Sequence, residues 1–564
     1  MARGRRQFLK FLGTGLTGAC AGGLGPLATA GAQSPRPAPF APIRPSTRDD
    51  VVLPAGYRYD VVARWSDRLP GTNARFGYNA DFTAFLPLQE PGHGVLVVNH
   101  EYVSLPEPGE IGVYLQTFPI VMGRAPRIDD EKEDVGVSVL HVRRSASGRW
   151  EIIAAPLTRR YDATSRMGAS GPALQNAGVV AGTLANCSGC HTPWQTVLTC
   201  EENFQNYVPE SVDTAGRGGV GGRFRQNGAH FGWVVEIDPL DRDWTPIKHT
   251  MLGRFRHENV ALRAEASRPV VAYMGDDRVN GHVYRFVSAQ PYAPGGDHRG
   301  SLLARGRLYA AVFHGDGTGE WRELAPDTPL RPSVGAPHPR IPRGSKTLGQ
   351  VYADLGAIVT DAFRASNLIG ATPTGRPEDI EIHPIDRSVY IAFTGAATAP
   401  GHLFPNVYGE IWRIVEEGDG TGTRFTWMRW RAGGPNDEER GGRVFAAPDN
   451  LAFDPAGHLW IVTDITTARL NADGYTAFKN NGMFFVPTSG PDAGAPLQFA
   501  SAPGEAELAG PSWTAGRETM FLSVQHPGEG YGIRGGGVSA PRGSNWPGGR
   551  AGDPPLPSVV AIRQ

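Results

Sequence analysis

Short apolar segments recur along most of the chain, and Gly, Pro, Asp and Asn residues separate them. The segments are rich in β-branched and aromatic residues, which is the composition that strands favour. They are residues 96–99, 233–237, 283–287, 308–313, 389–393, 411–415, 459–463 and 520–524. This pattern predicts an all-β protein built from many short strands.

Turn signals of one kind precede several of these segments. His383-Pro384-Ile385-Asp386-Arg387 and Asp454-Pro455-Ala456-Gly457-His458 place Pro, Gly or Asp where a hairpin reverses direction. The strands do not alternate with helical segments, so a parallel sheet is disfavoured. The recurrence favours a closed radial architecture, a β-propeller, and a large β-sandwich is the alternative. Helices are expected only in insertions, at about residues 107–124 and 172–186.

Composition narrows the class of protein without changing the predicted fold. Glycine (74) and proline (48) are abundant, as expected for many tight turns. Apolar residues make up 40% of the chain and the formal net charge is -1, which argues against a disordered chain. The chain has no excess of basic residues over acidic ones, so its charge does not indicate a nucleic-acid partner.

The N-terminus has the features of an export signal. Gly4-Arg5-Arg6-Gln7-Phe8-Leu9-Lys10 is close to the twin-arginine pattern, and small residues near position 30 offer a cleavage site. We therefore predict a twin-arginine signal peptide at 1–32, a flexible leader at 33–47 and a single domain at 48–564. The apolar stretch 11–27 is too short and glycine-rich for a stable membrane span. Export by the twin-arginine machinery would place a folded, cofactor-loaded protein in the periplasm or outside the cell.

All three cysteines of the predicted mature protein lie in the stretch 186–203. Cys187, Cys190 and His191 fit C-x-x-C-H, the pattern that attaches c-type haem, so electron transfer is one hypothesis. A disulfide between two of the three cysteines is another, because the predicted compartment is oxidising. The acidic end of the same stretch favours a third interpretation, a metal site.

Carboxylates also follow or precede strands elsewhere in the chain. Glu101 follows the strand ending near Asn99, and Asp276 with Asp277 follows another. Arg376 and Glu378 stand before a third strand, where a guanidinium beside hard oxygen ligands suits anion and metal binding. Further oxygen donors lie near later strand ends, at Asp449, Asp464 and Glu507. Loops at the mouth of a propeller channel are where such residues would converge.

Seven sequence blocks, in order, resemble the PhoX-type alkaline phosphatases over nearly the whole mature length. They are residues 99–102, 186–203, 254–258, 273–277, 370–378, 448–449 and 525–529. The resemblance implies a six-bladed β-propeller with additional helices and a site that holds iron (Fe³⁺) and calcium (Ca²⁺). It further implies hydrolysis of phosphate monoesters, small molecules that release inorganic phosphate, outside the cytoplasm.

The resemblance also assigns roles to residues of this chain. Cys187 matches an iron-binding cysteine, Glu258 and Glu378 match metal-binding carboxylates, and Arg376 and Trp194 match residues that line the phosphate site. We predict a metal or supporting role for a second set from charge and block membership. That set is Glu101, Glu201, Glu202, Asn203, Asp276, Asp277, Asp449, Asp464 and Glu507.

Three departures from the family pattern stand in the site blocks. Cys190 and Gln195 occupy positions where glycines are expected, and Thr394-Gly395-Ala396 replaces a Thr-Asn pair. Loss of that amide would weaken one calcium site. A non-catalytic, calcium-binding propeller is therefore the alternative function within the same fold.

Overall fold

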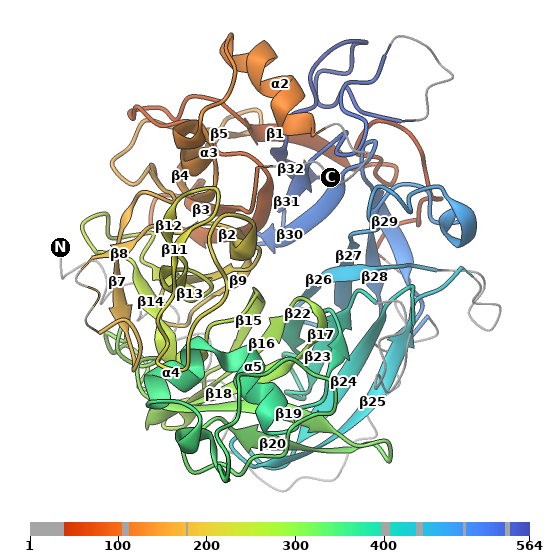
Figure 1. Ribbon diagram of the computed structural model, residues 1–564. Coiled ribbons are helices and arrows are strands. Elements are labelled where there is room, and N and C mark those ends of the chain that lie inside the picture. Colours follow the sequence, from red (N-terminus) through yellow and green to blue (C-terminus); the bar gives the residue numbers. More distant parts are fainter. Residues whose placement is uncertain are drawn as a thin grey trace, which may run out of the picture.

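The structure, a computed structural model, describes residues 39–103, 112–175, 177, 179–395, 406–435, 444–488, 492–535 and 542–564. The predicted signal peptide and residues 33–38 of the predicted leader lie outside the described residues. Figure 1 shows sheets arranged radially, with β2, β9, β15, β22, β26 and β30 nearest the centre. These innermost strands contact one another in a closed ring. The chain is a six-bladed β-propeller, as predicted.

Outward from the innermost strand, the main strands are antiparallel in each blade. The first has β2 (Ala80–Pro87), β3 (His93–His100), β4 (Gly136–Arg144) and β5 (Trp150–Ile152), with β6 (Arg159–Tyr161) on β4. The second has β9 (Asn186–His191), β10 (Val197–Glu201), β13 (Val234–Ile237) and β14 (Ile247–His249), extended by β7 (Arg166–Ser170), which pairs with β14 in parallel, and by β8 (Val180–Ala181). The third has β15 (His257–Arg263), β16 (Pro269–Asp276), β18 (Val283–Pro291), β19 (Gly306–Phe313) and β20 (Thr318–Glu323).

The remaining blades complete the ring. The fourth has β22 (Pro377–Ile382), β23 (Val389–Phe393), β24 (Glu410–Glu416) and β25 (Arg424–Ala432), and β25 pairs with β20 of the third blade. The fifth has β26 (Pro448–Phe453), β27 (Leu459–Thr463), β28 (Gly482–Val486) and β29 (Leu497–Ser501). The sixth has β30 (Glu507–Trp513), β31 (Met520–Gln525), β32 (Ser558–Arg563) and β1 (Arg58–Arg64). Because β1 comes from the N-terminal end of the described chain, pairing with β32 closes the ring.

Apolar clusters fill the spaces between neighbouring blades. On β3, Leu96 and Val98 pack toward the sixth blade, whereas Val95 and Val97 pack toward the second. Strands buried on both faces need apolar residues at consecutive positions, so the sequence shows continuous apolar segments rather than alternation. The largest cluster lies between the second and third blades and also receives the helical insertion that follows β20.

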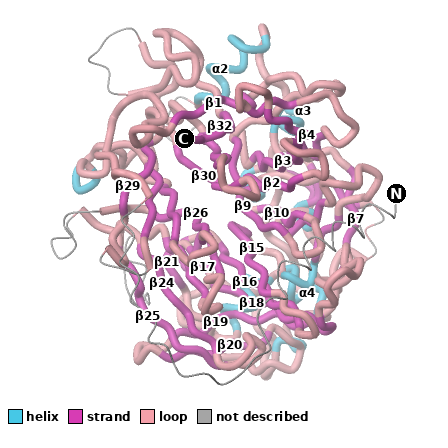
Figure 2. Tube along the Cα trace, turned by 180° about the vertical axis from the view of Figure 1, so that it is seen from behind, coloured by secondary structure: helices cyan, strands magenta, loops and turns pink. Residues whose placement is uncertain are grey.

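Within the described ranges, helices occur only in insertions between strands, as Figure 2 shows. The helix α2 (Val113–Met122) confirms the expected helix near 107–124, and α3 (Ile128–Asp134) follows it. The helices α4 (Leu355–Thr360) and α5 (Ala362–Leu368) precede the fourth blade. The helix expected at 172–186 was wrong, because the described part of this segment holds turns and β8. Leu174 adopts a φ of 60° there, which ends helical geometry.

Residues 39–47, which we expected within a flexible leader, lie along the fifth blade. The Ile43 amide donates to the Gln498 carbonyl, and the Phe40 ring packs against Trp460 and Phe499. Two small antiparallel pairings of described strands lie outside the blades. One joins β11 (Val220–Gly221) to β12 (Gln226–Asn227), and the other joins β17 (Val279–Gly281) to β21 (Thr374–Gly375), which is distant in the sequence. Of the described residues, none belongs to a helix with the length and hydropathy that a membrane crossing requires.

Candidate metal centre and active site

The same backbone irregularity recurs near the start of five innermost strands. Each of these strands carries one residue more than its partner at this level, which is a β-bulge. A bulge redirects side chains away from the regular alternation of a strand. The chemistry-bearing residues at these bulges are Asp81, Cys187, Glu258, Glu378 and Asp449. They form an inner ring that comes from five different blades.

A second ring of polar residues directly follows the second strand of the same five blades. Its members are Glu101, Glu202, Asp277, Thr394 and Asp464. The amide of each one donates to the carbonyl of the residue that precedes the innermost strand, at 2.8–3.2 Å. The five acceptor residues are Asn79, Ala185, Arg256, Arg376 and Ala447. The same backbone geometry is therefore repeated in five blades, and in each blade it presents two side chains.

The sixth blade departs from this arrangement. Glu507 pairs regularly with Gln525, and the bulge of this blade lies further along β30, between Ala509 and Ser512. The loop after β31 instead brings His526 and Glu529 to the site, where the Glu529 carboxylate accepts from the Tyr102 hydroxyl. Gln525 donates to Asp81 and to Glu101, so it joins two carboxylates of the first blade.

Residues of both rings line a cavity of about 340 Å³ at the channel mouth. Among the described residues that line it, nine carry carboxyl groups, whereas only Arg376 and His526 can carry positive charge. The carboxyl residues are Glu101, Glu202, Glu258, Asp277, Glu378, Asp449, Asp464, Glu507 and Glu529. Such an excess of buried negative charge requires cations or protons for compensation.

Several of these groups are close enough together to share an ion. The Cys187 Sγ atom lies 3.1 Å from Asp81 Oδ2 and 2.9 Å from Glu258 Oε2. Four groups of three residues have ligand atoms within 4.8 Å of one another. They are Asp81, Glu101 and Cys187; Cys187, Glu202 and Glu258; Glu258, Glu378 and Asp449; and Asp464, Glu507 and His526.

The crowding of acids perturbs their protonation. Burial raises the pKa of Glu258 well above its usual range, and the nearby carboxylates of Asp449 and Glu378 raise it further. Burial likewise raises the pKa of Asp449 to about 7. The pKa of the Cys187 thiol is raised by burial and then by Asp81 and Glu258. A bound cation would reverse these shifts, because it favours the deprotonated ligands.

Among the described residues that line this cavity, Arg376 is the one that carries a guanidinium. Its Nε and Nη2 atoms donate to the two oxygens of Asp277 at 2.9 and 2.6 Å, and Nη2 lies 3.0 Å from Glu378 Oε1. No described residue accepts a hydrogen bond from Nη1. Asp277 therefore fixes the guanidinium plane and leaves one edge for an anion in the cavity.

Comparison with known proteins identifies the family. The profile described as "Alkaline phosphatase PhoX" matches residues 38–528 of this chain.

The chain belongs to the PhoX alkaline phosphatase family.

A solved structure of Pseudomonas fluorescens PhoX in complex with vanadate, a transition state analogue, is 29% identical in sequence. It superposes with a TM-score of 0.75, covering 93% of this chain and 98% of that chain. A gluconolactonase from Xanthomonas campestris has a TM-score of 0.30 and 11% identity, covering 93% of this chain and 98% of its own. No curated protein matches the chain significantly. Membership of the PhoX family makes the chain a metal-dependent alkaline phosphatase, a phosphoric monoester hydrolase.

Most residues that the PhoX resemblance assigned to the site do meet in the cavity. Cys187, Glu258, Glu378 and Arg376 line it. The residues predicted from charge that also line it are Glu101, Glu202, Asn203, Asp277, Asp449, Asp464 and Glu507. Asn203 donates to Glu101 Oε1 at 2.8 Å, so its amide orients a carboxylate.

Glu201 and Asp276 lie elsewhere, because each faces away from the channel on its strand. Glu201 accepts from Lys248 Nζ at 2.6 Å and from the amides of Gly232 and Trp233. Asp276 accepts from Arg278 Nε at 2.8 Å and from the Arg256 amide. Both carboxylates thus make structural contacts away from the cavity, Asp276 through Oδ1 alone, and their position does not support the predicted metal role.

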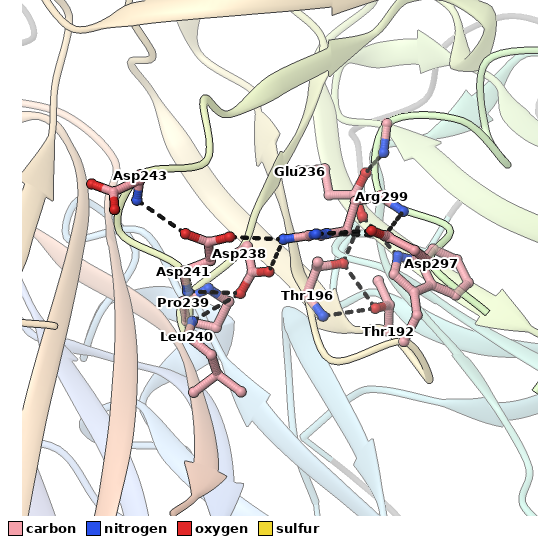
Figure 3. A network of polar contacts seen from close by, with 12 residues as sticks. Thr192, Thr196, Glu236, Asp238, Pro239, Leu240, Asp241, Asp243, Asp297 and Arg299 are labelled. Carbon is pink, nitrogen blue, oxygen red and sulfur yellow. Dashed lines mark hydrogen bonds and ion pairs between the residues drawn. The ribbon is translucent and has the colours of Figure 1, made fainter. Parts of the chain in front are cut away.

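Trp194 also lies outside the cavity. Its indole Nε1 donates to Glu236 Oε1 at 2.7 Å, and the same oxygen accepts from the Thr196 hydroxyl. Figure 3 shows Glu236 and Thr196 in the polar network that includes Arg299. The Trp194 ring contacts Tyr292 and His298 on the outer part of the molecule. This position does not support the predicted contact with phosphate.

Sequence reasoning missed Asp81, and it left His526, Gln525 and Glu529 without a role. Asp81 stands at the β2 bulge, in the position that Cys187 and Glu258 occupy in their blades. Each blade of this kind has a functional side chain at the start of its first strand and a polar residue directly after its second strand. Glu101 follows the second strand of the first blade, so a search for its counterpart at the start of the first strand would have found Asp81. The separation of 20 residues and the lack of a local motif concealed it.

The cysteines and the Thr394 departure have simple structural explanations. Cys187, Cys190 and Cys200 are free. In β9 the Cys187 thiol faces the channel, Cys190 packs against the apolar cluster between blades, and His191 is exposed. This strand geometry does not bring the three residues to one haem. Thr394 donates to Glu378 and to the Pro448 carbonyl, so it supports a site carboxylate, and Ala396 lies outside the described residues.

Proposed function

We propose that this PhoX member hydrolyses phosphate monoesters outside the cytoplasm with iron held at Cys187 and calcium held by the carboxylates. Export by the twin-arginine route would deliver the folded, metal-loaded enzyme. The donor types support this assignment. A buried thiol with Asp81, Glu202 and Glu258 within reach combines a soft and several hard donors, which suits iron. The group of Glu258, Glu378 and Asp449 offers only oxygen, which suits calcium.

The bound metals would supply positive charge that polarises the phosphoryl group and activates the attacking oxygen. The chain's own contribution begins at Arg376, whose free edge suits the equatorial oxygens of the phosphoryl group. Asp277 holds that guanidinium in one orientation, so little side-chain entropy is lost when phosphate binds. Thr394 and Asn203 orient Glu378 and Glu101 in the same way.

The observation that carries the proposal is the juxtaposition of one oriented arginine with a nine-carboxyl cavity. Acids alone would repel a phosphate, and an arginine alone would hold it without activating it. Together with metal ions they suit an anionic ester whose charge increases during reaction.

The experiment is reconstitution of the metal-free protein with iron and calcium, singly and together, followed by assay on 4-nitrophenyl phosphate. We expect turnover only with both metals and loss of turnover on chelation. Glu378→Ala should lose bound metal and activity, whereas Glu151→Ala, an exposed substitution on β5, should lose neither. Full metal occupancy without turnover would leave the non-catalytic, calcium-binding alternative.

A further inference from the structure

A second cavity, of about 160 Å³, adjoins the metal cavity on the side of the third blade. We call it the arginine pocket. Three phenylalanine residues and three arginine residues contribute to its lining, and they are Phe204, Phe255, Phe363, Arg254, Arg278 and Arg364. Phe363 and Arg364 belong to α5, which Figure 1 shows over the third blade.

Chain neighbours connect the two cavities. Asn203 lines the metal cavity and Phe204 lines the arginine pocket. Likewise, Asp277 lines the metal cavity and the next residue, Arg278, lines the arginine pocket. Because adjacent residues lie on opposite sides of the same two corners, the pockets share a wall. A substrate that occupies both cavities therefore has to pass over this wall, which is one residue thick at each corner.

Two arginines of the pocket retain unused donors. Arg364 donates from Nε to Asp361 and from Nη2 to the Val212 carbonyl, which leaves Nη1. Arg278 contacts Asp276 through Nε and Glu210 through Nη2, which again leaves Nη1. Within the described ranges no residue accepts a hydrogen bond from either Nη1. The Arg254 guanidinium, by contrast, donates hydrogen bonds to the carbonyls of Phe231, Glu210 and Gly228.

Rigid aromatic contacts hold these guanidinium groups in place. The Arg278 guanidinium lies 4.2 Å from the centre of the Phe363 ring, and that of Arg254 lies 4.7 Å from the centre of Phe204. In the part of the lining that the structure describes, three arginines face two carboxylates, Glu210 and Asp361. The pocket thus carries the opposite sign of charge to the acid-rich metal cavity beside it.

We propose that the arginine pocket binds a second anionic group, a carboxylate or phosphate, on the leaving-group side of the substrate. The inference rests on the proposed phosphatase function and names its preferred substrates as phosphomonoesters with a remote negative charge. The two Nη1 donors pair with the remote anion while Arg376 holds the reacting phosphoryl group. The phenylalanine rings contact the carbon chain between the two charges.

The test compares two substrates that differ only at the far end of a six-carbon chain. Sorbitol 6-phosphate ends in a hydroxymethyl group and 6-phosphogluconate ends in a carboxylate. We expect the metal-loaded enzyme to favour 6-phosphogluconate by about tenfold in kcat/KM, the effect of one charge-assisted hydrogen bond. Arg364→Gln should reduce that preference to about twofold or less and leave kcat/KM for sorbitol 6-phosphate nearly unchanged.

Two further variants sharpen the result. Ser211→Asp adds a negative charge at an exposed lining position without removing a packed side chain, and should also abolish the preference. Arg143→Gln, at a half-exposed arginine on β4, is the matched control and should preserve it. An unchanged preference in both pocket variants overturns the proposal. A changed inhibition by inorganic phosphate with an unchanged preference also overturns it, because the pocket would then bind free anion rather than substrate.

Failure of the phosphatase function is recognised separately. If the metal-loaded wild type hydrolyses neither substrate, the proposed function fails, and calorimetric binding of 6-phosphogluconate decides the pocket by itself. Weaker binding to Arg364→Gln than to wild type supports the pocket, and equal binding overturns it. If sorbitol 6-phosphate is hydrolysed and Arg364 has no effect on either substrate, only the pocket fails.

Discussion

Arg376 combines an unusual backbone conformation with a demanding side-chain geometry. Its φ of 59° places it in the left-handed region, which is unfavourable for a residue with a side chain. Its carbonyl accepts from the Thr394 amide, so the same residue belongs to the repeated corner of the blades and to the anion site. Burial lowers the pKa of Arg376, but Asp277 and Glu378 outweigh that effect and hold it above its usual value. The guanidinium therefore stays charged at alkaline pH.

Replacing Arg376 with lysine tests the role of the planar, bidentate group. An ammonium cannot contact both Asp277 oxygens in one plane and present a further edge to phosphate. We expect Arg376→Lys to lower kcat/KM on 4-nitrophenyl phosphate by about 10- to 100-fold, with metal content retained. Arg387→Lys is the matched control, because Arg387 also has a left-handed φ, of 64°, but lies at an exposed turn. Equal activity of Arg376→Lys and wild type would contradict this role.

At the scale of single elements, the bulge of β9 determines where the Cys187 thiol points. The Asn99 side chain, at the end of β3, donates from Nδ2 to the carbonyls of Cys187 and Ser188 at 2.7 and 3.1 Å. These carbonyls belong to the irregular part of the strand, where ladder partners are missing. Asn99 therefore fastens the first blade to the bulge of the second and fixes the thiol between Asp81 and Glu258.

Asn99→Ala should lower both stability and metal binding. Two buried carbonyls lose their donor, which costs about 1–3 kcal/mol in unfolding free energy. Asn406→Ala is the matched control, because Asn406 Nδ2 also donates to two carbonyls, those of Gly409 and Gly433, away from the cavity. Denaturant unfolding and metal analysis by mass spectrometry measure the two effects. Both variants should lose stability, and only Asn99→Ala should lose iron. Iron retention in Asn99→Ala would contradict the assignment.

At the scale of the whole molecule, the ring brings acids from six blades into one buried volume. Glu101, Glu258 and Glu507 stand far apart in the sequence, and the ring brings them to one cavity where carboxyl groups outnumber basic groups among the described lining residues. Burial raises the pKa of Asp449 to about 7, and that of Glu378 rises well above its usual range from burial and from Asp277. In the metal-free protein these acids therefore keep their protons to higher pH than carboxyl groups exposed to water do.

The metal-free protein should therefore lose stability as pH rises. Below a folded pKa of about 7 and above its unfolded value, Asp449 binds a proton in the folded state only, so stability falls with rising pH across this window. Groups with still higher pKa values, such as Glu258, extend the loss to alkaline pH. We expect a lower Tm at pH 9 than at pH 6 by calorimetry after chelation. Protein loaded with iron and calcium is the control, and its Tm should change much less. A metal-free Tm that is equal or higher at pH 9 would contradict this account.

Much of the fold was readable from the sequence because each strand is buried on both faces. Segments such as 95–98 and 459–462 are continuously apolar, and this pattern predicts strands between packed blades. The helix expected at 172–186 failed because single residues with left-handed backbone, Leu174 and Ala185, interrupt it. Many site acids were also found, since Glu101, Asp277 and Asp464 directly follow apolar strands.

By itself the sequence predicted the propeller and the family, and it determined which residue types are present for a thiol-and-carboxylate metal site. These follow from local order along the chain, through continuous apolar segments, turn residues and short motifs. The tertiary structure alone decided which acids face the channel. Asp81 enters the site through the bulge of its strand, whereas Glu201 turns toward Lys248, 47 positions away, and Trp194 toward Glu236. A one-residue shift in register reverses the face of a side chain, and distant blades, not neighbouring residues, set that register.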